Sequence, residues 1–460
     1  MAVFSIIKLS ELEGAKRIDA EYYKPEYLSL LDRLRKAGCV PAKSVAFPVR
    51  RKFKPNVGEY FDYIEISEVD LSTGEFNISK IIGEEAPDRA QWIVAKEDVL
   101  VSTVRPIRNA VVLIREDKEN LVCSSGFAVI HPYKIQANYL FLYFKTSFVP
   151  KLLDRYTTAT EYPAINWNDV LNTPIYVGSE EFQVKVSFLI NECFALLEQS
   201  RALYSQAENL LLEELGFGNF KPKYKKTYTA KLSDAFSTHR IDAEYFQPAY
   251  EEVIENIKNY RYGFDKLLKH VENVEPNFDP TKYPEESFCY VELADIDSSI
   301  GVIQNTNDIK GQEAPSRARR ILKKNDVIVS SVEGSLEKVA LVDKEHDGCL
   351  ASTGFFQFRP LKIPPEVFLI LLKTPVLQSQ LKKKCSGTIL TAIPKKSLGD
   401  IVIPLLPYPT QQEIASLIQK SHEARKKAKE LLNAAKKAVE IAIEEGENDA
   451  LNYLSKIKIS

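Results

Sequence analysis

The chain has 460 residues, of which 45% are hydrophobic and 27% are charged, a composition typical of a globular protein with roughly two to four domains. Its formal net charge of −2 does not indicate nucleic-acid binding, although basic residues could still gather on one face. No apolar run approaches the roughly 18 residues that cross a bilayer, and the N-terminus becomes charged too early for a signal peptide. The composition therefore excludes a membrane-spanning chain, and we expect a cytoplasmic protein.

The chain is a tandem duplication. The motif RIDAEYYKPEY at residues 17–27 returns as RIDAEYFQPAY at residues 240–250, an offset of 223 (240 − 17). Four further pairs of segments follow in the same order, beginning at Tyr63 and Tyr290, Gly83 and Gly311, Lys96 and Lys324, and Ser124 and Ser352. The later pairs have an offset of 228 (352 − 124), which places an insertion of five residues between Tyr250 and Tyr290. Such a long period indicates two repeated domains rather than a solenoid.

Each repeat is predicted to contain strands followed by a helix, because short runs rich in Val, Ile, Tyr and Phe are typical of strands. In chain order, the predicted strands of the first repeat are residues 63–69, 99–104, 110–114 and 127–130. Those of the second repeat are residues 290–296, 327–332, 339–342 and 355–358. Residues 138–145 and 366–373 are more continuously apolar, which predicts a helix in each repeat.

Each repeat ends in a long predicted helix, over residues 179–216 and 410–446. Apolar residues recur there at steps of three and four, with no Pro or Gly between 179 and 215. Thr410 and Glu413 fit a capping box, and Gly216 and Gly446 lie where C-terminal caps occur. Each helix would have about 35 residues and a length of about 50 Å. A narrow apolar stripe of that length favours antiparallel packing of one long helix on the other.

The predicted fold is therefore mixed α/β, with two pseudo-symmetric globular domains separated by two long helices that form an antiparallel coiled coil. The expected order is a first domain (1–178), a first helix (179–216), a linker (217–229), a second domain (230–409), a second helix (410–446) and a C-terminal tail (447–460). The six cysteines, at 39, 123, 193, 289, 349 and 385, include no CxxC pair. We expect free, mostly buried thiols and neither a zinc site nor disulfides.

The pattern resembles the specificity subunits of type I restriction-modification systems. The strongest similarity is IVIPLLPYPTQQEIASLIQ at residues 401–419, which resembles the family's apolar strand, proline-rich turn and helix opening with Gln. Residues 332–343 (VEGSLEKVALVD) and 386–398 (SGTILTAIPKKSL) resemble two of the family's loops. The first repeat departs from this pattern at residues 173–190, where Gln183 remains but most of the prolines are missing.

The resemblance implies two target-recognition domains that read a split double-stranded DNA site, with the coiled coil as a spacer. It also implies two methyltransferase subunits and a restriction-translocase subunit as partners. S-adenosylmethionine, ATP and Mg²⁺ would then be bound by those partners, and no cofactor by this chain.

Motifs of an enzyme were sought and not found. The sequence has no [ND]PP[YF] motif of an adenine methyltransferase, no phosphate-binding GxxxxGK[ST] and no HExxH, and its five histidines are scattered. The acidic residues that agree between the repeats are expected to be structural: Asp19 and Asp242, Glu21 and Glu244, and Glu65 and Glu292. Two alternatives stay open, which are a duplicated scaffold that binds only protein and a methyltransferase with a divergent motif.

The candidate DNA contacts lie in loops, because reading DNA requires basic and polar side chains that reach phosphates and base edges. We define a central loop in each repeat (103–109 and 331–338) and a late loop (158–168 and 386–396). The candidates in the first repeat are Arg105 and Arg108 in the central loop and Thr158, Thr160, Tyr162, Asn166 and Asn168 in the late loop. Those in the second repeat are Glu333, Ser335 and Lys338, and then Thr388, Thr391, Lys395 and Lys396.

Arg89 and Arg317 match between the repeats, so a phosphate contact competes with a structural ion pair as their role. For the other candidates the alternatives are solvated side chains and turn formers. The linker lysines Lys221, Lys223, Lys225 and Lys226 are expected to be solvated. The loops differ between repeats, with Arg105 where the second has Glu333 and Tyr162 where it has Leu390, which suits two domains that read different half-sites.

Overall fold

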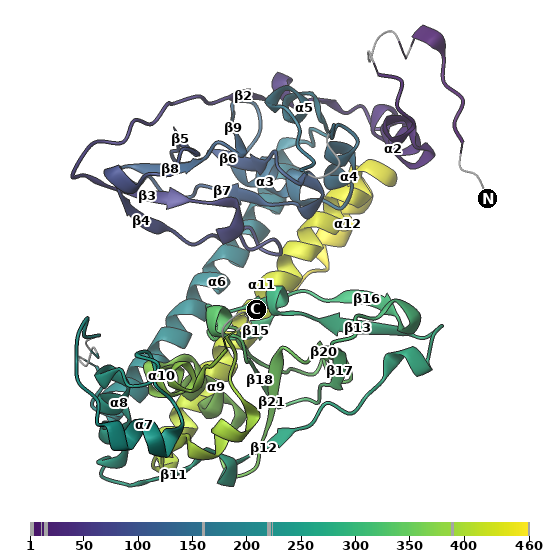
Figure 1. Cartoon of the computed structure of the whole chain (residues 1–460). Helices are drawn as coiled ribbons and strands as arrows, with labels where there is room; N and C mark the ends of the chain where they lie inside the picture. Colours follow the sequence, from purple (N-terminus) through teal and green to yellow (C-terminus); the bar gives the residue numbers. More distant parts are fainter. Residues whose placement is uncertain are drawn as a thin grey trace. The chain divides into compact units, whose positions relative to one another are not determined.

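The computed structural model describes residues 4–10, 12, 17–158, 162–218, 222, 224–387 and 391–458. The chain forms two compact units (Figure 1). The first unit comprises residues 1–196 and 426–460, and the second comprises residues 197–425. Each unit therefore contains one repeat's globular part together with one half of each long helix.

Two four-stranded sheets form the centre of the first unit. In pairing order, the first sheet is β2 (Ala46–Pro48), β9 (Phe127–Pro132), β6 (Val99–Ser102) and β7 (Val111–Leu113), and the second is β4 (Ser79–Ile82), β3 (Tyr60–Ile64), β8 (Leu121–Ser124) and β5 (Ala90–Ile93). All four residues of β6 and of β8 are buried, which explains why their sequences are continuously apolar rather than alternating.

The second unit repeats the order of both sheets and adds a two-stranded pair, β14 (Ile296–Asp297) and β15 (Val302–Ile303). Its sheets are β12 (Val271–Val274), β21 (Phe355–Pro360), β18 (Val327–Ser330) and β19 (Val339–Leu341), and then β16 (Asn307–Lys310), β13 (Ser287–Val291), β20 (Leu350–Ser352) and β17 (Ala318–Ile321). The short pair β1 (Val40–Pro41) and β10 (Pro174–Ile175) returns as β11 (Phe264–Lys266) and β22 (Val402–Pro404). The predicted pseudo-symmetric mixed α/β fold is thus confirmed.

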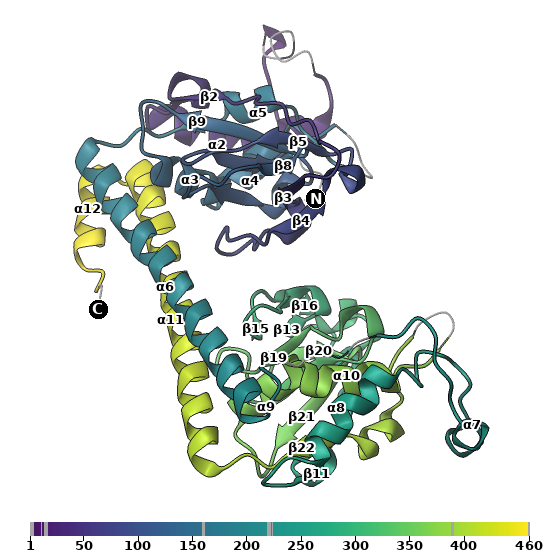
Figure 2. The same ribbon diagram turned by 90° about the vertical axis from the view of Figure 1, so that its left-hand side faces the viewer.

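Helices cover the first sheet of each unit. The predicted apolar helices are present as α3 (Ala137–Lys145) and α9 (Pro365–Lys373), and each is followed by a second helix, α4 (Phe148–Asp154) or α10 (Pro375–Lys384). In the second unit, α8 (Pro248–Lys258), α9 and α10 lie together beside β21 and β22 (Figure 2). Their buried side chains join those of the sheet in one apolar core.

One predicted strand in each repeat is too long. The segment 63–69 leaves the sheet at Ile64 and continues as a 3-10 turn, η3 (Ile66–Glu68), and the segment 290–296 is interrupted in the same way by η8 (Leu293–Asp295). Alternating apolar residues continue through the turn, so periodicity did not reveal the end of the strand. The five-residue insertion is also less local than predicted, because Ser79 and Asn307 occupy equivalent register positions with an offset of 228, against 227 for Tyr63 and Tyr290.

The long helices are α6 (Glu180–Glu214) and α11 (Tyr408–Glu444), close to their predicted bounds. They pair antiparallel within each unit. In the first unit, Glu447, just after α11, accepts a hydrogen bond from the backbone N–H of Ser179, just before α6. In the second unit, the Ser200 hydroxyl of α6 lies 3.1 Å from the Ser421 hydroxyl of α11. The predicted coiled-coil pairing is confirmed.

The ends of these helices were predicted with mixed success. Gly216 and Gly446 have φ values of 73° and 112°, where glycine is favoured, as expected for the residues that end α6 and α11. The capping box at Thr410 is wrong, because α11 begins two residues earlier and Gln411 already donates to the Pro407 carbonyl. The predicted C-terminal tail contains a further helix, α12 (Glu447–Ser455).

The expectation of six free cysteines is also wrong. Cys289 and Cys349 form a disulfide, because the neighbouring parallel strands β13 and β20 place their Cα atoms 4.8 Å apart. In the first unit, Asp62 and Leu121 occupy this register position. Cys123 and Cys385 are buried free thiols, as predicted.

Candidate nucleic-acid interface

The central and late loops of the first unit are joined by their backbones. Val104 and Ala164 form an isolated antiparallel bridge. The Arg105 N–H donates to the Pro163 carbonyl at 2.7 Å, and the Ile165 N–H donates to the Thr103 carbonyl at 2.9 Å. Two segments that are about 60 residues apart in sequence therefore form one surface.

The second unit joins its loops in the same way. Val332 and Ala392 form the equivalent bridge. The Glu333 N–H donates to the Thr391 carbonyl at 3.0 Å, and the Ile393 N–H donates to the Ser331 carbonyl at 2.9 Å. Both repeats thus hold the two loops together with main-chain hydrogen bonds that do not depend on the loop side chains.

In the first unit this pairing brings Arg105 and Tyr162 together. Arg105 has a left-handed backbone (φ 47°), and its guanidinium carbon lies 5.8 Å from the centroid of the Tyr162 ring. Tyr162 is 71% exposed, and Arg108, at the end of η5 (Pro106–Arg108), is exposed as well. An exposed aromatic ring can stack on bases, and the guanidinium group beside it can bind phosphates.

The rest of the first late loop is exposed in part. Thr158, Asn166 and Asn168 are exposed, whereas Thr160 lies outside the described residues. Asn166 precedes the short helix α5 (Trp167–Asn172), and its N–H donates to the Asp169 carboxylate at 2.8 Å. Asn166 therefore begins a helix, the turn-forming role weighed for it, and its exposure still allows a DNA contact.

Several candidates of the second unit have partners within the protein. The Ser335 hydroxyl lies 2.8 Å from that of Ser330, and the Lys338 ammonium donates to the Ile296 carbonyl at 3.0 Å. Lys395 forms an ion pair with Glu275, and the Thr391 hydroxyl donates to the Gly387 carbonyl at 3.3 Å. These contacts explain the polar residue types without DNA, most directly for Lys338, whose charge is engaged by a backbone carbonyl. Glu333 is half-buried, Lys396 is exposed, and Thr388 lies outside the described residues.

Arg89 and Arg317 occupy equivalent exposed positions just before β5 and β17. Their carbonyls accept hydrogen bonds from Ser125 (2.7 Å) and Thr353 (2.8 Å). Among the residues that the structure describes, neither arginine forms an ion pair, so the alternative of a structural ion pair finds no support.

The repeated RIDAEY motif holds the start of the late loop. Arg17 pairs with Asp19 at 2.8 Å, lies over the Tyr22 ring and donates to the carbonyls of Tyr156 (3.2 Å) and Thr157 (3.3 Å). The second motif repeats this arrangement. Arg240 pairs with Asp242 at 2.7 Å, lies over the Tyr245 ring and donates to the Cys385 carbonyl at 2.7 Å. The matched aspartates thus orient an arginine, which agrees with the structural role predicted for them.

A lysine ends the first apolar helix of each unit, and it is buried in the first unit and half-buried in the second. The Lys145 ammonium donates to the Leu71 carbonyl at 2.6 Å and to the carbonyl of Asn109, at the end of the central loop, at 3.2 Å. The equivalent Lys373 donates to the Ser298 carbonyl. Burial lowers the pKa of Lys145 to about 7 and that of Lys373 to about 8. These lysines hold the loops to the helices, and sequence reasoning did not single them out.

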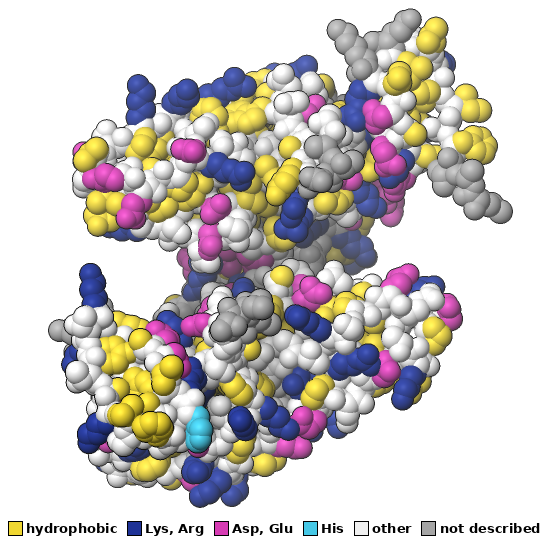
Figure 3. Space-filling model, in the orientation of Figure 1, with side chains coloured by type: hydrophobic (Ala, Val, Ile, Leu, Met, Phe, Trp, Pro, Cys, Tyr) yellow, Lys and Arg dark blue, Asp and Glu magenta, His cyan; other side chains and the backbone are white. Residues whose placement is uncertain are grey.

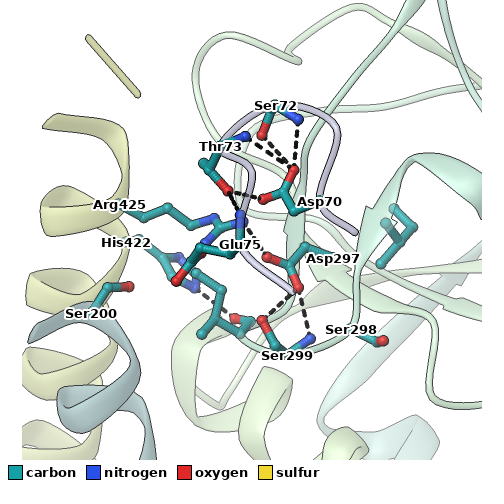
Figure 4. Close-up of polar contacts among 12 residues, drawn as sticks. Asp70, Ser72, Thr73, Glu75, Ser200, Asp297, Ser298, Ser299, His422 and Arg425 are labelled. Carbon is teal, nitrogen blue, oxygen red and sulfur yellow. Dashed lines mark hydrogen bonds and ion pairs between the residues drawn. The ribbon is translucent and has the colours of Figure 1, made fainter. Parts of the chain in front are cut away.

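The turns that receive these lysines are each built on an aspartate (Figure 4). In the first unit, the Asp70 carboxylate accepts hydrogen bonds from the hydroxyls of Ser72 and Thr73, both at 2.7 Å. In the second unit, Asp297 accepts from Ser299 and forms a buried ion pair with Arg425 of α11 at 2.6 Å. This ion pair fastens the second unit's turn to its half of α11.

One basic segment was missed by the sequence reasoning. Residues 50–54 read RRKFK, and all four of their basic side chains are exposed. A run of four charges in five residues was visible in the sequence, but such runs are commonly just solvated. The linker lysines Lys225 and Lys226 are exposed in this way, while Lys221 and Lys223 lie outside the described residues. Only the contacts of the segment 50–54, described below, distinguish it from other basic runs.

Among the described residues, no group of three or more His, Cys, Asp or Glu side chains could hold a metal ion. No helix in the described part of the chain is long and apolar enough to cross a membrane.

Comparison with known proteins finds a family to which part of the chain is similar. Residues 298–436, in the second repeat, match the family model described as the type I restriction modification DNA specificity domain. Over this stretch the chain is similar to that family. The first repeat has the same strand order as the second and is its internal duplicate. The comparison with curated proteins returns no match.

Three solved structures are similar to this chain over most of its length. The HsdS subunit from Thermoanaerobacter tengcongensis has 21% identity, a TM-score of 0.31, and coverage of 90% of this chain and 95% of its own. The type I specificity subunit from M. genitalium has 12% identity, a TM-score of 0.40, and coverage of 88% and 94%. A chain from a study of complex assembly in the type I R-M system has 20% identity, a TM-score of 0.32, and coverage of 91% and 96%.

Proposed function

We propose that this chain reads a bipartite DNA target, with one half-site recognised by each repeat. The observation that carries the proposal is the matched joining of the central and late loops. The same backbone bonds hold the loops in both units, from Arg105 N–H to Pro163 and from Glu333 N–H to Thr391. The side chains on this common frame differ, as the reading of two different base sequences requires.

Catalysis is assigned to partner subunits. Two methyltransferase subunits would bind this chain and flip the target adenine, and a restriction-translocase subunit would join them. The partners would bind S-adenosylmethionine, ATP and Mg²⁺, and the complex would act on DNA in the cytoplasm. The chain itself would position these activities without taking part in the chemistry.

The long helices would set the distance between the two half-sites. Helix α6 has 35 residues and α11 has 37, which correspond to lengths of about 52 and 55 Å at 1.5 Å per residue. Helices of that length are sufficient to separate two readers by one turn of duplex, about 34 Å.

The proposal is tested by mapping methylated adenines in genomic DNA treated with the chain and its methyltransferase partners. We expect two short defined sequences separated by a spacer of fixed length. Exchanging first-repeat residues for their second-repeat equivalents, with Arg105→Glu and Tyr162→Leu, should change only one of the two sequences. A target that is continuous, or one in which both halves change, would contradict the proposal.

The variant Lys134→Glu provides a matched control. It also reverses an exposed charge in the first unit, but Lys134 follows the end of β9 that lies away from the loops. Both halves of the target should stay unchanged. If wild-type chain binds protein partners but shows no salt-dependent binding of duplex DNA, the scaffold alternative replaces the reader.

A further inference from the structure

The basic segment 50–54 pairs with the edge of a sheet, as a very short strand would. It follows β2 and lies antiparallel to β5, where the Phe53 N–H donates to the Gln91 carbonyl and the Ile93 N–H donates to the Arg51 carbonyl, both at 2.8 Å. Lys52 and Trp92 form the bridge between these two bonds. Because side chains alternate between the two faces of an extended strand, successive residues of the segment point in opposite directions.

The odd-numbered residues of the segment contact the rest of the unit, although the Arg51 side chain stays 43% exposed. Arg51 forms an ion pair with Asp98, whose side chain is fully buried, and the Phe53 ring packs against Phe61 with centroids 4.7 Å apart. Arg50, Lys52 and Lys54 therefore share the outer face, and we call these three residues the basic edge. Figure 3 shows Lys and Arg side chains along the margin of the first unit that carries the segment between β2 and β3.

The basic edge extends between two groups of predicted DNA contacts. At one end, the Arg50 guanidinium carbon lies 5.2 Å from the centroid of the Trp167 ring, and Trp167 directly follows Asn166 of the late loop. At the other end, the antiparallel register carries Lys54 toward the start of β5, next to Arg89. Successive basic-edge residues are about 6.6 Å apart, comparable with the spacing of phosphates along one DNA strand.

The second unit keeps one of the two backbone bonds at this place and has the opposite charge. Phe278 is equivalent to Phe53, because it donates to the Arg319 carbonyl as Phe53 does to that of Gln91, and it packs on Phe288. The residues equivalent to Arg50, Lys52 and Lys54 are Glu275, Asn277 and Asp279. The formal charge is thus +3 on the basic edge and −2 at the matched positions.

The difference in charge between the two units shows whether the three basic residues are needed for folding. Glu275 pairs with Lys395 and Asp279 pairs with Arg319, so the acidic version of the edge is satisfied by the protein itself. Among the described residues, Lys52 and Lys54 form no ion pair, and Arg50 contacts only an aromatic ring. The fold therefore does not need the three positive charges, since the second unit keeps the contacts of Phe278 without them.

We infer that the basic edge binds the phosphates of duplex DNA beside the half-site of the first repeat, and that the second repeat has no equivalent phosphate site. This inference rests on the proposed function, and it adds that the two repeats contribute differently to DNA binding. The first repeat supplies sequence-independent attraction that depends on salt, whereas the second repeat binds DNA through its loops.

The test compares three variants of the full chain by fluorescence anisotropy with a random-sequence DNA duplex between 50 and 200 mM KCl. The triple variant Arg50→Gln, Lys52→Gln and Lys54→Gln should reduce the slope of log K against log salt by about 2.7, because each phosphate that a basic side chain neutralises adds about 0.9 to the slope. Binding of a target duplex should weaken to the same extent, because phosphates carry no sequence information. Circular dichroism checks that the variant is folded.

Two controls decide the result. Replacing Lys225 and Lys226 of the linker and the nearby Lys231 with Gln also lowers the formal net charge from −2 to −5, and it should change the slope by less than one. The variant Glu275→Gln with Asp279→Asn should not reduce the slope. The inference is overturned if the basic-edge variant behaves like the linker control, or if the second-unit variant reduces the slope as much. If wild-type chain shows no salt-dependent binding at all, the proposed function fails instead.

Discussion

Replacing Lys145 with Met should remove a pH dependence from the stability of the first unit. The Lys145 side chain is almost completely buried, and its ammonium is held by the carbonyls of Leu71 and Asn109. Burial lowers its pKa from 10.5 to about 7 in the folded chain. The unfolded chain therefore binds a proton between about pH 7 and 10.5 that the folded chain does not bind.

The sign and size of the effect follow from this difference in pKa. Because the unfolded state binds more protons, the free energy of unfolding rises with pH across this window, by about 1.4 kcal/mol per unit at most. This gain in the free energy of unfolding is lost as the pH falls to about 7, the pKa of Lys145 in the folded chain. Between pH 7 and 9 the contribution is about 2 kcal/mol, since the lysine is already half deprotonated at pH 7. Met does not titrate, so the variant should lack this rise.

Tryptophan fluorescence provides a selective assay, because the chain has only two tryptophans, Trp92 and Trp167, and both belong to the first unit. Urea unfolding of wild type and variant would be measured at pH 7 and pH 9. At pH 9 the variant should be the less stable, because two buried carbonyls lose their donor at about 1–3 kcal/mol each. The exposed Lys151→Met is the matched control. An equal gap between wild type and Lys145→Met at both pH values would refute the reasoning.

Three further predictions concern recognition and stability. Arg105→Ala should weaken binding of the target duplex by about 1–3 kcal/mol if the guanidinium is bidentate to a guanine, and an unchanged affinity in a titration would remove it from the interface. Asp326→Asn should destabilise the second unit by about 2–4 kcal/mol, because the buried carboxylate binds Arg359 through both oxygens at 2.9 and 3.0 Å. Amide hydrogen exchange should then become faster in β18 and stay unchanged in β6. Equal changes in both strands would contradict this prediction. Deleting seven residues from each long helix removes about 10.5 Å, so the methylated target should have a spacer about three base pairs shorter, and an unchanged spacer would exclude the helices as its determinant.

The duplication made most of the fold predictable. Matching segments around Tyr63 and Tyr290 identified two equivalent domains, and uninterrupted heptad-like spacing identified α6 and α11 within two residues of their ends. The beginning of α11 was missed because Pro409 is tolerated in the first turn of a helix, so the proline-rich turn reads as a linker in sequence. The Cys289–Cys349 disulfide was missed because it depends on a strand pairing between residues 60 positions apart.

The candidate interface was predictable in position but not in detail. The loops that contain Arg105 and Tyr162 were identified by their divergence between repeats, and the backbone bonds that join them could not be inferred from one sequence. Lys338 illustrates the limit, since a loop lysine is indistinguishable in sequence from one whose ammonium is held by a carbonyl, here that of Ile296. Conversely, the outward face of residues 50–54 becomes visible only once the inward contacts of Arg51 and Phe53 are known.

The main-chain joining of the central and late loops has a consequence for how this protein changes over generations. Mutations of Arg105, Tyr162 or their neighbours leave intact the hydrogen bonds that set the shape of the loops, because those bonds are made by N–H and C=O groups that every residue except proline supplies. Substitutions that change the recognised DNA sequence therefore have little effect on the folding of the loops. A lineage can explore new recognition sequences one substitution at a time without passing through misfolded intermediates, and it can do so independently in each repeat.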